Sequence, residues 1–403
     1  MTHILQCHDI VKTDLVRGEG CHLFDSRGAR FTDFESGIWS AALGHGHPRI
    51  TAVIREQSAA LTHLGTRYPS PLAERAAVDI LGTVGMGEGK CVLLSSGSEA
   101  VEFGVQVARR FSGKPLLLTL AHSYLAAYGS AGAKRSGEWC EFDAGACTHT
   151  GPCDCLDAIP FADIGAFVFE PGGSGMAFVK FPPQRLVEEI ARRVRAHGGL
   201  LMANEVTTGM GRTGRWFGFQ HYGVQPDVVA LGKGLGNGYP VSAVAMRPEV
   251  AERVERGGFH YAQSHQNDPL GCAVASEVIA VLREELWVDR GERMGQGFLE
   301  SLKQLVERHA VLREARGRGL LLGLEFHPHE RLSAASVYAQ LVEQGFLVGC
   351  YPAGNMLRFS PPLVIAREDI DGLITSVDAI LREACRVRPQ PSSEQNQHDR
   401  GGQ

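Results

Sequence analysis

A single lysine follows an apolar run in the stretch DVVALGKGLGNGYP, residues 227–240. Gly232 precedes Lys233, and glycine then occupies every second position after it, at 234, 236 and 238. An amine beside a buried strand is costly unless it reaches water, has a partner or takes part in chemistry. An amine held in a pocket of low dielectric has a lowered pKa and is nucleophilic, as Schiff-base chemistry requires. Lys233 is therefore either a candidate nucleophile or a turn lysine that reaches solvent.

A candidate anion site follows another apolar run, in CVLLSSGSEAVEFGVQVARRF (91–111). The run ends in the small residues SSGS, and a helical pattern with acidic residues in its first turn begins there. Free backbone N–H groups and the helix dipole favour an anion at such a position, although an ordinary serine N-cap has the same pattern. A phosphate cradle together with a Schiff-base lysine indicates pyridoxal phosphate as the cofactor.

Three short apolar runs are expected to position these groups: AFVFEP (166–171), LLMANEV (200–206) and DVVALGK (227–233). Continuous apolar runs are typical of strands buried on both faces of a parallel sheet. Each run ends in a polar residue, namely Glu170, Asn204 and Lys233. Because ligands bind beyond the carboxyl ends of such strands, we expect the three residues to share one site. A helical pattern between the first two runs completes a strand–helix–strand crossover.

The pattern along the chain predicts two domains. Alternating apolar runs and helical patterns over residues 47–284 predict a large α/β domain with a mostly parallel sheet. Residues 1–46 contain a hairpin pattern, and residues 285–387 contain helices and short strands, including GLLLGLEF, FLVGCY and MLRFSPPLVI. We expect both chain ends to form a smaller α+β domain. Residues 388–403 are polar and aperiodic, which predicts disorder.

Composition excludes several classes of function. The chain has 403 residues, a net charge of -5 and no long basic run, so it lacks the electrostatic footprint of a protein that binds nucleic acid or membrane surfaces. No signal-like or membrane-length apolar stretch is present, and we expect a cytoplasmic protein. Ten cysteines do not form a disulfide framework in so long a chain. The cluster of Cys140, Cys147, Cys153, Cys155 and His149 fits a loop without a ligand better than a zinc site.

The stretch from residue 204 to residue 240, NEVTTGMGRTGRWFGFQHYGVQPDVVALGKGLGNGYP, resembles the signature of the class III aminotransferases. LFDSRGARFTDFESGIWSAALGHGHP, SSGSEAVE and NMLRFSPPL are similar to three further motifs of that family, and the resemblance extends to about residue 385. It implies the fold type I architecture, with a mostly parallel sheet of the seven-stranded type. It also implies pyridoxal phosphate, transfer of an amino group between an amine or amino acid and a 2-keto acid, and a homodimer with shared active sites.

The resemblance implies roles for individual residues. Lys233 is expected to form the Schiff base with the cofactor and then to act as general acid and base. The other expected cofactor-binding positions are Gly97 and Ser98 at the phosphate, Tyr124 and Val206 on the two ring faces, Asn204 at the ring nitrogen, and Ser264 from a second subunit. Arg358 matches an arginine that binds a substrate carboxylate, and Trp39 lies at the expected substrate entrance. A salt bridge for Arg358 and a core or interface position for Trp39 are the alternatives.

The sequence departs from the family pattern at three positions. Asn204 replaces an aspartate that keeps the pyridine ring protonated, so the quinonoid intermediate is expected to lose electrostatic stabilisation. Leu125-Ala126 replaces His-Gly after the stacking aromatic. EPGGSGM lacks a glutamate that holds the substrate-binding arginine in many members, which leaves the substrate class open.

These observations predict a PLP-dependent aminotransferase. The uncharged Asn204 leaves a racemase, epimerase or lyase as an alternative, because such PLP chemistry depends less on the quinonoid intermediate. A non-catalytic PLP-binding protein is a third hypothesis, against which the intact Lys233 argues.

Overall fold

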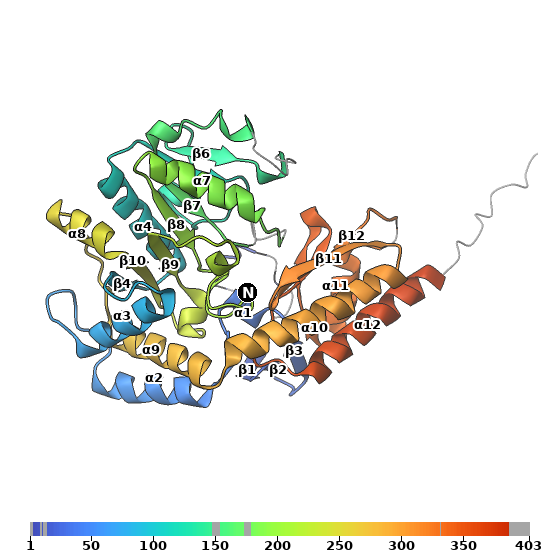
Figure 1. Cartoon of the computed structure of the whole chain (residues 1–403). Coiled ribbons are helices and arrows are strands. Elements are labelled where there is room, and N and C mark those ends of the chain that lie inside the picture. The colour runs from blue at the N-terminus through green and yellow to red at the C-terminus, as the bar shows by residue number, and fades with distance from the viewer. Residues whose placement is uncertain are drawn as a thin grey trace, which may run out of the picture.

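The computed structural model describes residues 3–8, 10, 14–146, 154–172, 179–330 and 332–386. A seven-stranded sheet organises the larger lobe (Figure 1). In spatial order its strands are β4 (Lys90–Leu94), β10 (Ser242–Met246), β9 (Val228–Leu231), β8 (Leu200–Asn204), β7 (Ile164–Phe169), β5 (Leu116–Leu120) and β6 (Trp139–Phe142). All neighbouring pairs are parallel except the two that β10 makes with β4 and β9. The predicted mostly parallel sheet is confirmed.

Both faces of this sheet are buried, which explains the continuous apolar runs. Successive side chains of a strand point to opposite faces, so Ala166 and Val168 of β7 belong to one hydrophobic cluster and Phe167 and Phe169 to the other. The first cluster is covered by α4 (Gly97–Ser112), α5 (Gly129–Ala133) and α8 (Pro248–Arg256). The second is covered by α2 (Pro48–Ala60), α3 (Pro71–Val84), α7 (Gln184–Ala196) and α9 (Pro269–Glu284).

The crossover between β7 and β8 forms as expected. Its helix, α7, starts directly after Pro183 and buries its apolar stripe, which contains Leu186, Ile190 and Val194. Gly198 follows the helix with φ +76°, a left-handed conformation that glycine adopts without a Cβ penalty. The chain can therefore return to the sheet within a few residues.

The smaller lobe contains two four-stranded sheets. One has the order β11 (Leu312–Arg318), β12 (Leu321–Phe326), β15 (Met356–Phe359), β14 (Gly349–Tyr351), and the other has the order β1 (Leu15–Glu19), β2 (His22–Asp25), β3 (Arg30–Asp33), β13 (Phe346–Leu347). Strands β2 and β3 form the predicted hairpin, and β3 pairs in parallel with β13, so the two ends of the chain meet. The lobe also contains α10 (Trp287–Arg308), α11 (Ala334–Glu343) and α12 (Arg367–Arg386), and Figure 1 shows α10 running from the larger lobe alongside α12.

Two strands predicted near the C-terminal end differ from the structure. The run FLVGCY was expected to be one strand, but it divides into β13 and β14, which belong to different sheets. The run MLRFSPPLVI forms a strand only as far as Phe359, because Pro361 and Pro362 have no N–H group to donate to a sheet.

Some predictions fall on residues that the structure does not describe. These are the tail at 388–403, Cys147, Cys153, His149 and most of EPGGSGM. Seven cysteines are free thiols, namely Cys7, Cys21, Cys91, Cys140, Cys155, Cys272 and Cys350. Among the described helices, none has both the length and the apolar character needed to cross a bilayer.

Candidate active site

Lys233 lies just beyond the carboxyl end of β9, at the start of a 3₁₀ turn. Its φ is +46°, a left-handed conformation that costs a non-glycine residue about 1–3 kcal/mol and persists where the surrounding structure enforces it. Its Nζ lies 3.3 Å from Thr207 Oγ1 and 4.0 Å from the centroid of the Trp39 ring. The backbone thus directs the amine toward Thr207 and Trp39 and not into solvent.

The surroundings of Lys233 favour the neutral amine. Burial lowers the pKa of Lys233 to about 7, the nearby Glu170 carboxylate opposes this shift, and the positive charges of Arg358 and Arg212 add to it. In a large fraction of the molecules, the Lys233 amine is therefore unprotonated near neutral pH. An unprotonated amine can attack a carbonyl carbon and can accept a proton.

The start of α4 has an ordinary cap and an exposed set of donors. Ser96 is the N-cap, its hydroxyl accepts a hydrogen bond from Glu99 N at 3.3 Å, and the Glu99 carboxylate accepts one from Ser96 N at 2.7 Å. The serine N-cap interpretation therefore holds for Ser96. The next residues, Gly97 and Ser98, open the helix, where the first N–H groups have no acceptor within the helix. Ser98 Oγ accepts a hydrogen bond from Ala127 N at 2.9 Å.

The loops beyond β4, β8 and β9 meet at Gly97. A Cβ atom on Gly97 would lie 2.5 Å from Val206 Cγ1, and one on Gly232 would lie 3.3 Å from the Gly97 Cα. Real Cβ atoms essentially never approach other atoms to 2.5 Å. Glycine is therefore required where the helix start approaches the end of β8, beside Val206.

Asn204 is the last residue of β8 and is held by local hydrogen bonds. Its Nδ2 donates to the backbone carbonyls of Tyr124 at 3.3 Å and Leu125 at 3.4 Å, and its Oδ1 accepts from Val206 N at 3.2 Å. Two carbonyl acceptors on one side of the amide fix its orientation. An aspartate could not donate these two hydrogen bonds, so asparagine suits this position better in the structure as it stands.

Arg358, in β15, is almost fully buried, with 2% of its surface exposed. Its Nη1 donates to Tyr351 Oη at 2.6 Å, and its Nη2 lies 3.4 Å from Glu35 Oε1. Its Cζ lies 4.1 Å from the centroid of the Trp39 ring, the same ring that Lys233 approaches. Burial lowers the pKa of Arg358 and raises that of Glu35. Arg358 thus forms a salt bridge with Glu35, as in the alternative that the sequence left open. The guanidinium of this pair also lies against the Trp39 ring that Lys233 approaches.

A left-handed turn holds Trp39 in place. This turn, α1 (Ser36–Trp39), has φ values of 47°, 57°, 57° and 69° at Ser36, Gly37, Ile38 and Trp39. The buried Arg212 donates to Ser36 Oγ at 3.0 Å, and Ser36 Oγ donates to the Ser360 carbonyl at 2.7 Å. Contacts from distant parts of the chain therefore maintain a backbone that local preferences oppose.

Ser264 lies on an exposed connection before α9. Its neighbour Gln263 has Nε2 at 3.4 Å from Ser95 Oγ and at 3.3 Å from Glu99 Oε1. The connection thus runs beside the helix start of its own chain. The expected contribution of Ser264 to a second subunit stays a prediction.

Sequence reasoning missed three residues of this site. Thr207, beside the Lys233 amine, lies within the quoted motif that starts at Asn204, so its hydroxyl was an available signal. Glu35 and Tyr351 hold Arg358, but neither has a pattern that points to such a contact. Glu35 is separated from Arg358 by 323 positions.

The residues present fit pyridoxal phosphate. A helix start with accessible N–H groups suits a phosphate. The close approach at Gly97 would be filled by any side chain, and Lys233 supplies an amine with a lowered pKa at the end of β9, which β10 separates from β4 in the sheet. The predicted residues Gly97, Tyr124, Asn204, Val206 and Lys233 all lie on or after the carboxyl ends of sheet strands.

The sequence matches the family described as aminotransferase class-III over residues 6–125 and 156–381. An acetylornithine aminotransferase from Methanopyrus kandleri is 32% identical over 380 residues, which cover 91% of this chain and 94% of the relative. One from Aquifex aeolicus is 30% identical over 400 residues, covering 94% of this chain and all (100%) of the relative.

Solved structures of aminotransferases are also similar to this chain. The acetylornithine aminotransferase from Elizabethkingia anophelis has a TM-score of 0.83 at 27% identity and covers 94% of this chain and 96% of its own. The ornithine aminotransferase from Toxoplasma gondii has a TM-score of 0.84 at 26% identity, with coverages of 96% and 94%. Agreement of sequence and fold along nearly the full length shows that the chain belongs to the class III aminotransferases and is a pyridoxal-phosphate-dependent aminotransferase.

Proposed function

We propose that this enzyme transfers the terminal amino group of an N-acylated basic amino acid, of which acetylornithine is the type, to a 2-keto acid. The names of the similar proteins from Methanopyrus kandleri and Aquifex aeolicus support this substrate class. One structural observation supports the acceptor half of the proposal, whereas the donor class rests on the names of the relatives. The Lys233 amine and the Arg358 guanidinium both lie about 4 Å from one Trp39 ring, at 4.0 Å and 4.1 Å.

This arrangement suits the 2-keto acid acceptor, whose carboxylate is attached to its reacting carbon. A carboxylate bound by the Arg358 guanidinium would place the adjacent carbon toward Lys233 Nζ. Arginine binds carboxylates through two parallel hydrogen bonds, which fix orientation as well as position. Glu35 competes for the same guanidinium, so a substrate without a carboxylate leaves Arg358 paired with Glu35.

Bound pyridoxal phosphate supplies an electron-withdrawing ring that stabilises negative charge on the substrate carbon. We assign the phosphate to the N–H groups at Gly97 and Ser98, and the two ring faces to Tyr124 and Val206. Asn204, which lies beside Val206, is assigned to the ring nitrogen, where its amide carries no charge. These residues would hold the ring by hydrogen bonding and packing, without a carboxylate partner at this position.

Lys233 is assigned the proton transfers. Its neutral amine can remove a proton from the donor carbon and return one to the acceptor carbon, because burial keeps its pKa at about 7. The buried Trp39 covers the amine and restricts water at Nζ. Arg358 would hold the carboxylate of the 2-keto acid, so that its reacting carbon lies within reach of Lys233 in the second half of the reaction.

We further propose a cytoplasmic homodimer in which Ser264 of each chain completes the phosphate site of the other. Exposure of Ser264 on a connection beside α4 supports a contact with a second subunit. The racemase, lyase and non-catalytic alternatives gain no support from the comparisons, since the relatives named above are aminotransferases.

The test follows the cofactor spectrum of the purified enzyme after addition of a single amino donor. We expect N-acetylornithine to convert the cofactor to its amino form with kcat/KM at least about tenfold above that of ornithine, which corresponds to about 1.4 kcal/mol of transition-state binding. A subsequent addition of 2-oxoglutarate should restore the starting spectrum. Equal conversion by both donors would contradict the proposed substrate class, and no conversion by any donor would contradict transamination.

A further inference from the structure

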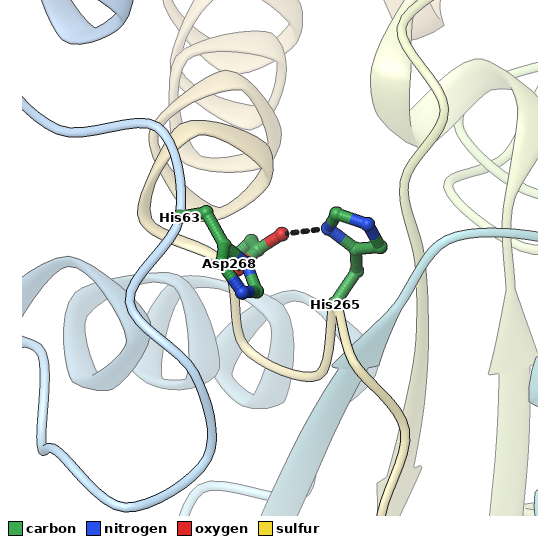
Figure 2. A group of neighbouring side chains, drawn as sticks. All are labelled: His63, His265 and Asp268. Carbon is green, nitrogen blue, oxygen red and sulfur yellow. Dashed lines mark hydrogen bonds and ion pairs between the residues drawn. The ribbon is translucent and has the colours of Figure 1, made fainter.

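Two imidazoles and one carboxylate converge on the surface, in a cluster that the active site does not use. His63 Nδ1 lies 2.6 Å from Asp268 Oδ1, and His265 Nδ1 lies 2.5 Å from Asp268 Oδ2. One ligand-type atom from each residue lies within 4.8 Å of the others. Figure 2 shows the aspartate with a histidine on either side, one from the loop before α3 and one from the turn before α9.

The orientation of Asp268 is unusual for its place in the fold. Asp268 is the N-cap of α9, where an aspartate normally accepts a hydrogen bond from an N–H group in the first turn. Its side chain makes no such cap hydrogen bond and directs one oxygen to each imidazole. The carboxylate therefore contacts the two histidines and does not cap its own helix.

We propose that His63, His265 and Asp268 bind a divalent transition-metal ion, with Zn²⁺ as the best fit. Two imidazole nitrogens and one carboxylate oxygen are a ligand set typical of Zn²⁺, and a solvent molecule can fill the fourth tetrahedral position. Mg²⁺ and Ca²⁺ prefer oxygen ligands alone, so they fit this set poorly. None of these three ligands belongs to the cysteine-rich stretch between Cys140 and Cys155.

Small side-chain movements complete the coordination geometry. Metal–ligand bonds of about 2.0–2.2 Å in a tetrahedron place ligand atoms roughly 3.4 Å apart. The separations of 2.6 Å and 2.5 Å from the carboxylate must lengthen by less than about 1 Å, and the other ligand-atom separations, which lie within 4.8 Å, must shorten by at most about 1.4 Å. The His63 and His265 side chains are 48% and 62% exposed, so solvent leaves room for these movements, whereas Asp268 is only 13% exposed. The metal replaces the hydrogens at Nδ1, and each imidazole then carries its proton on Nε2.

Such an ion would join two segments far apart in sequence. His63 and Asp268 are separated by 205 positions, and His265 directly follows Ser264. The ion would fix the turn that presents Ser264. This consequence depends on the proposed dimer, but metal binding itself does not.

The experiment measures zinc bound to the PLP-loaded enzyme after removal of metals with a chelator and dialysis against buffered ZnCl₂. We expect one Zn²⁺ per chain, with a Kd at or below about 10 μM. His63→Ala, His265→Ala and Asp268→Asn should each weaken binding at least about 100-fold, since loss of even an outer-shell partner typically weakens it about 10–100-fold. His327→Ala removes another exposed histidine, after β12 in the smaller lobe, and should leave binding unchanged.

Cofactor content and circular dichroism confirm folding of every variant. Because three separate substitutions remove one ligand each, failure of one variant to fold leaves the test intact. Absence of stoichiometric zinc at about 100 μM would overturn the proposal. Zinc retained equally by the substituted and unsubstituted chains would identify an adventitious site elsewhere and would overturn it too.

Discussion

At the scale of single residues, one tryptophan ring brings together the two cations of the site. Trp39 is buried, and Lys233 Nζ and Arg358 Cζ lie 4.0 Å and 4.1 Å from its centroid. Cation–π attraction contributes roughly 0.5–2 kcal/mol per pair, depending on desolvation. The two like charges disfavour each other, and this helps to lower the pKa of Lys233. The ring therefore lies against both the Arg358 guanidinium and an amine that, with a pKa of about 7, is partly neutral at neutral pH.

The lowered pKa of Lys233 predicts an unusual pH profile for cofactor uptake by the apoenzyme. Only the unprotonated amine attacks the cofactor carbonyl, so the capture rate should rise about tenfold per pH unit below pH 7 and level off above it. Rapid mixing with pyridoxal phosphate, followed by borohydride trapping, measures this rate. A rate that keeps rising to pH 10 would show an ordinary lysine.

Substitution of Asn204 by aspartate separates stability from catalysis. Asn204→Asp removes two hydrogen bonds to carbonyl oxygens and places a carboxylate beside them, which should lower the free energy of unfolding of the apoenzyme by about 1–3 kcal/mol. With the cofactor bound, the carboxylate should favour a protonated ring and raise the half-reaction rate at least about tenfold. Denaturant unfolding and stopped-flow spectroscopy measure the two effects.

Asn355→Asp is the matched control, because Asn355 Nδ2 also donates to two carbonyls, those of Phe326 and His327. It should lower stability in the same way and leave the half-reaction unchanged. An Asn204→Asp enzyme with no gain in rate would show that the asparagine does not limit transamination.

At the scale of elements, the sequence predicted the strand ends of the large sheet, but it did not predict all helices and strands of the smaller lobe. The runs that end in Glu170, Asn204 and Lys233 are buried on both faces, so their apolar character is continuous. Strand β11 reads LREARGR, with several charged residues, and its single neighbour is β12; no continuous apolar run marks it. Helix α11 was likewise missed, although Ser333 caps it.

The left-handed turn at Ser36–Trp39 had no signal in the sequence. Isoleucine and tryptophan disfavour positive φ, and the contacts that enforce it come from Arg212 and the Ser360 carbonyl, far along the chain. Local preference therefore could not reveal how Trp39 is aimed. The residues of the site were recognisable by type and motif, but the pairing of Glu35 with Arg358 required the tertiary structure.

The close approach of α4 to β8 predicts a strong effect of Gly97→Ala. The added methyl group would lie 2.5 Å from Val206 Cγ1, so the helix start must move. We expect a loss of about 1–3 kcal/mol of stability and at least about a tenfold loss of cofactor affinity. Gly82→Ala, in α3 with open space around it, should instead stabilise by about 0.5–1 kcal/mol. Denaturant unfolding measures the stability of each variant, and cofactor titration measures its affinity for pyridoxal phosphate. Equal stability and equal affinity of the two variants would contradict the tight approach at Gly97.

At the scale of the whole molecule, residues of the site come from both lobes. Lys233 and Asn204 belong to the large sheet, Arg358 to β15, and Trp39 to the segment after β3. Pairing of β3 with β13 links the two chain ends, so Trp39 and Arg358 are held in one body. A shift between the lobes would therefore change the distance from Arg358 to Lys233. The domain boundaries themselves stay a prediction.

The proposed dimer predicts complementation between two defective chains. Lys233→Ala should abolish activity, and Ser264→Ala should weaken the phosphate site of the neighbouring chain. In a mixed dimer, the site that retains Lys233 receives Ser264 from its partner, so half of the sites should have wild-type cofactor affinity and activity. Co-expression with two affinity tags isolates the mixed dimer. If the intact-lysine site keeps the Ser264→Ala defect, Ser264 acts within its own chain.

The central claim is that Lys233 is the one side chain joined covalently to the cofactor. Borohydride reduction of the PLP-loaded enzyme, followed by peptide mass mapping, tests it most directly. We predict the reduced pyridoxyl group on Lys233 alone, and none on the Lys233→Ala protein. A label on a different lysine, or an equally labelled Lys233→Ala protein, would contradict this account of the site.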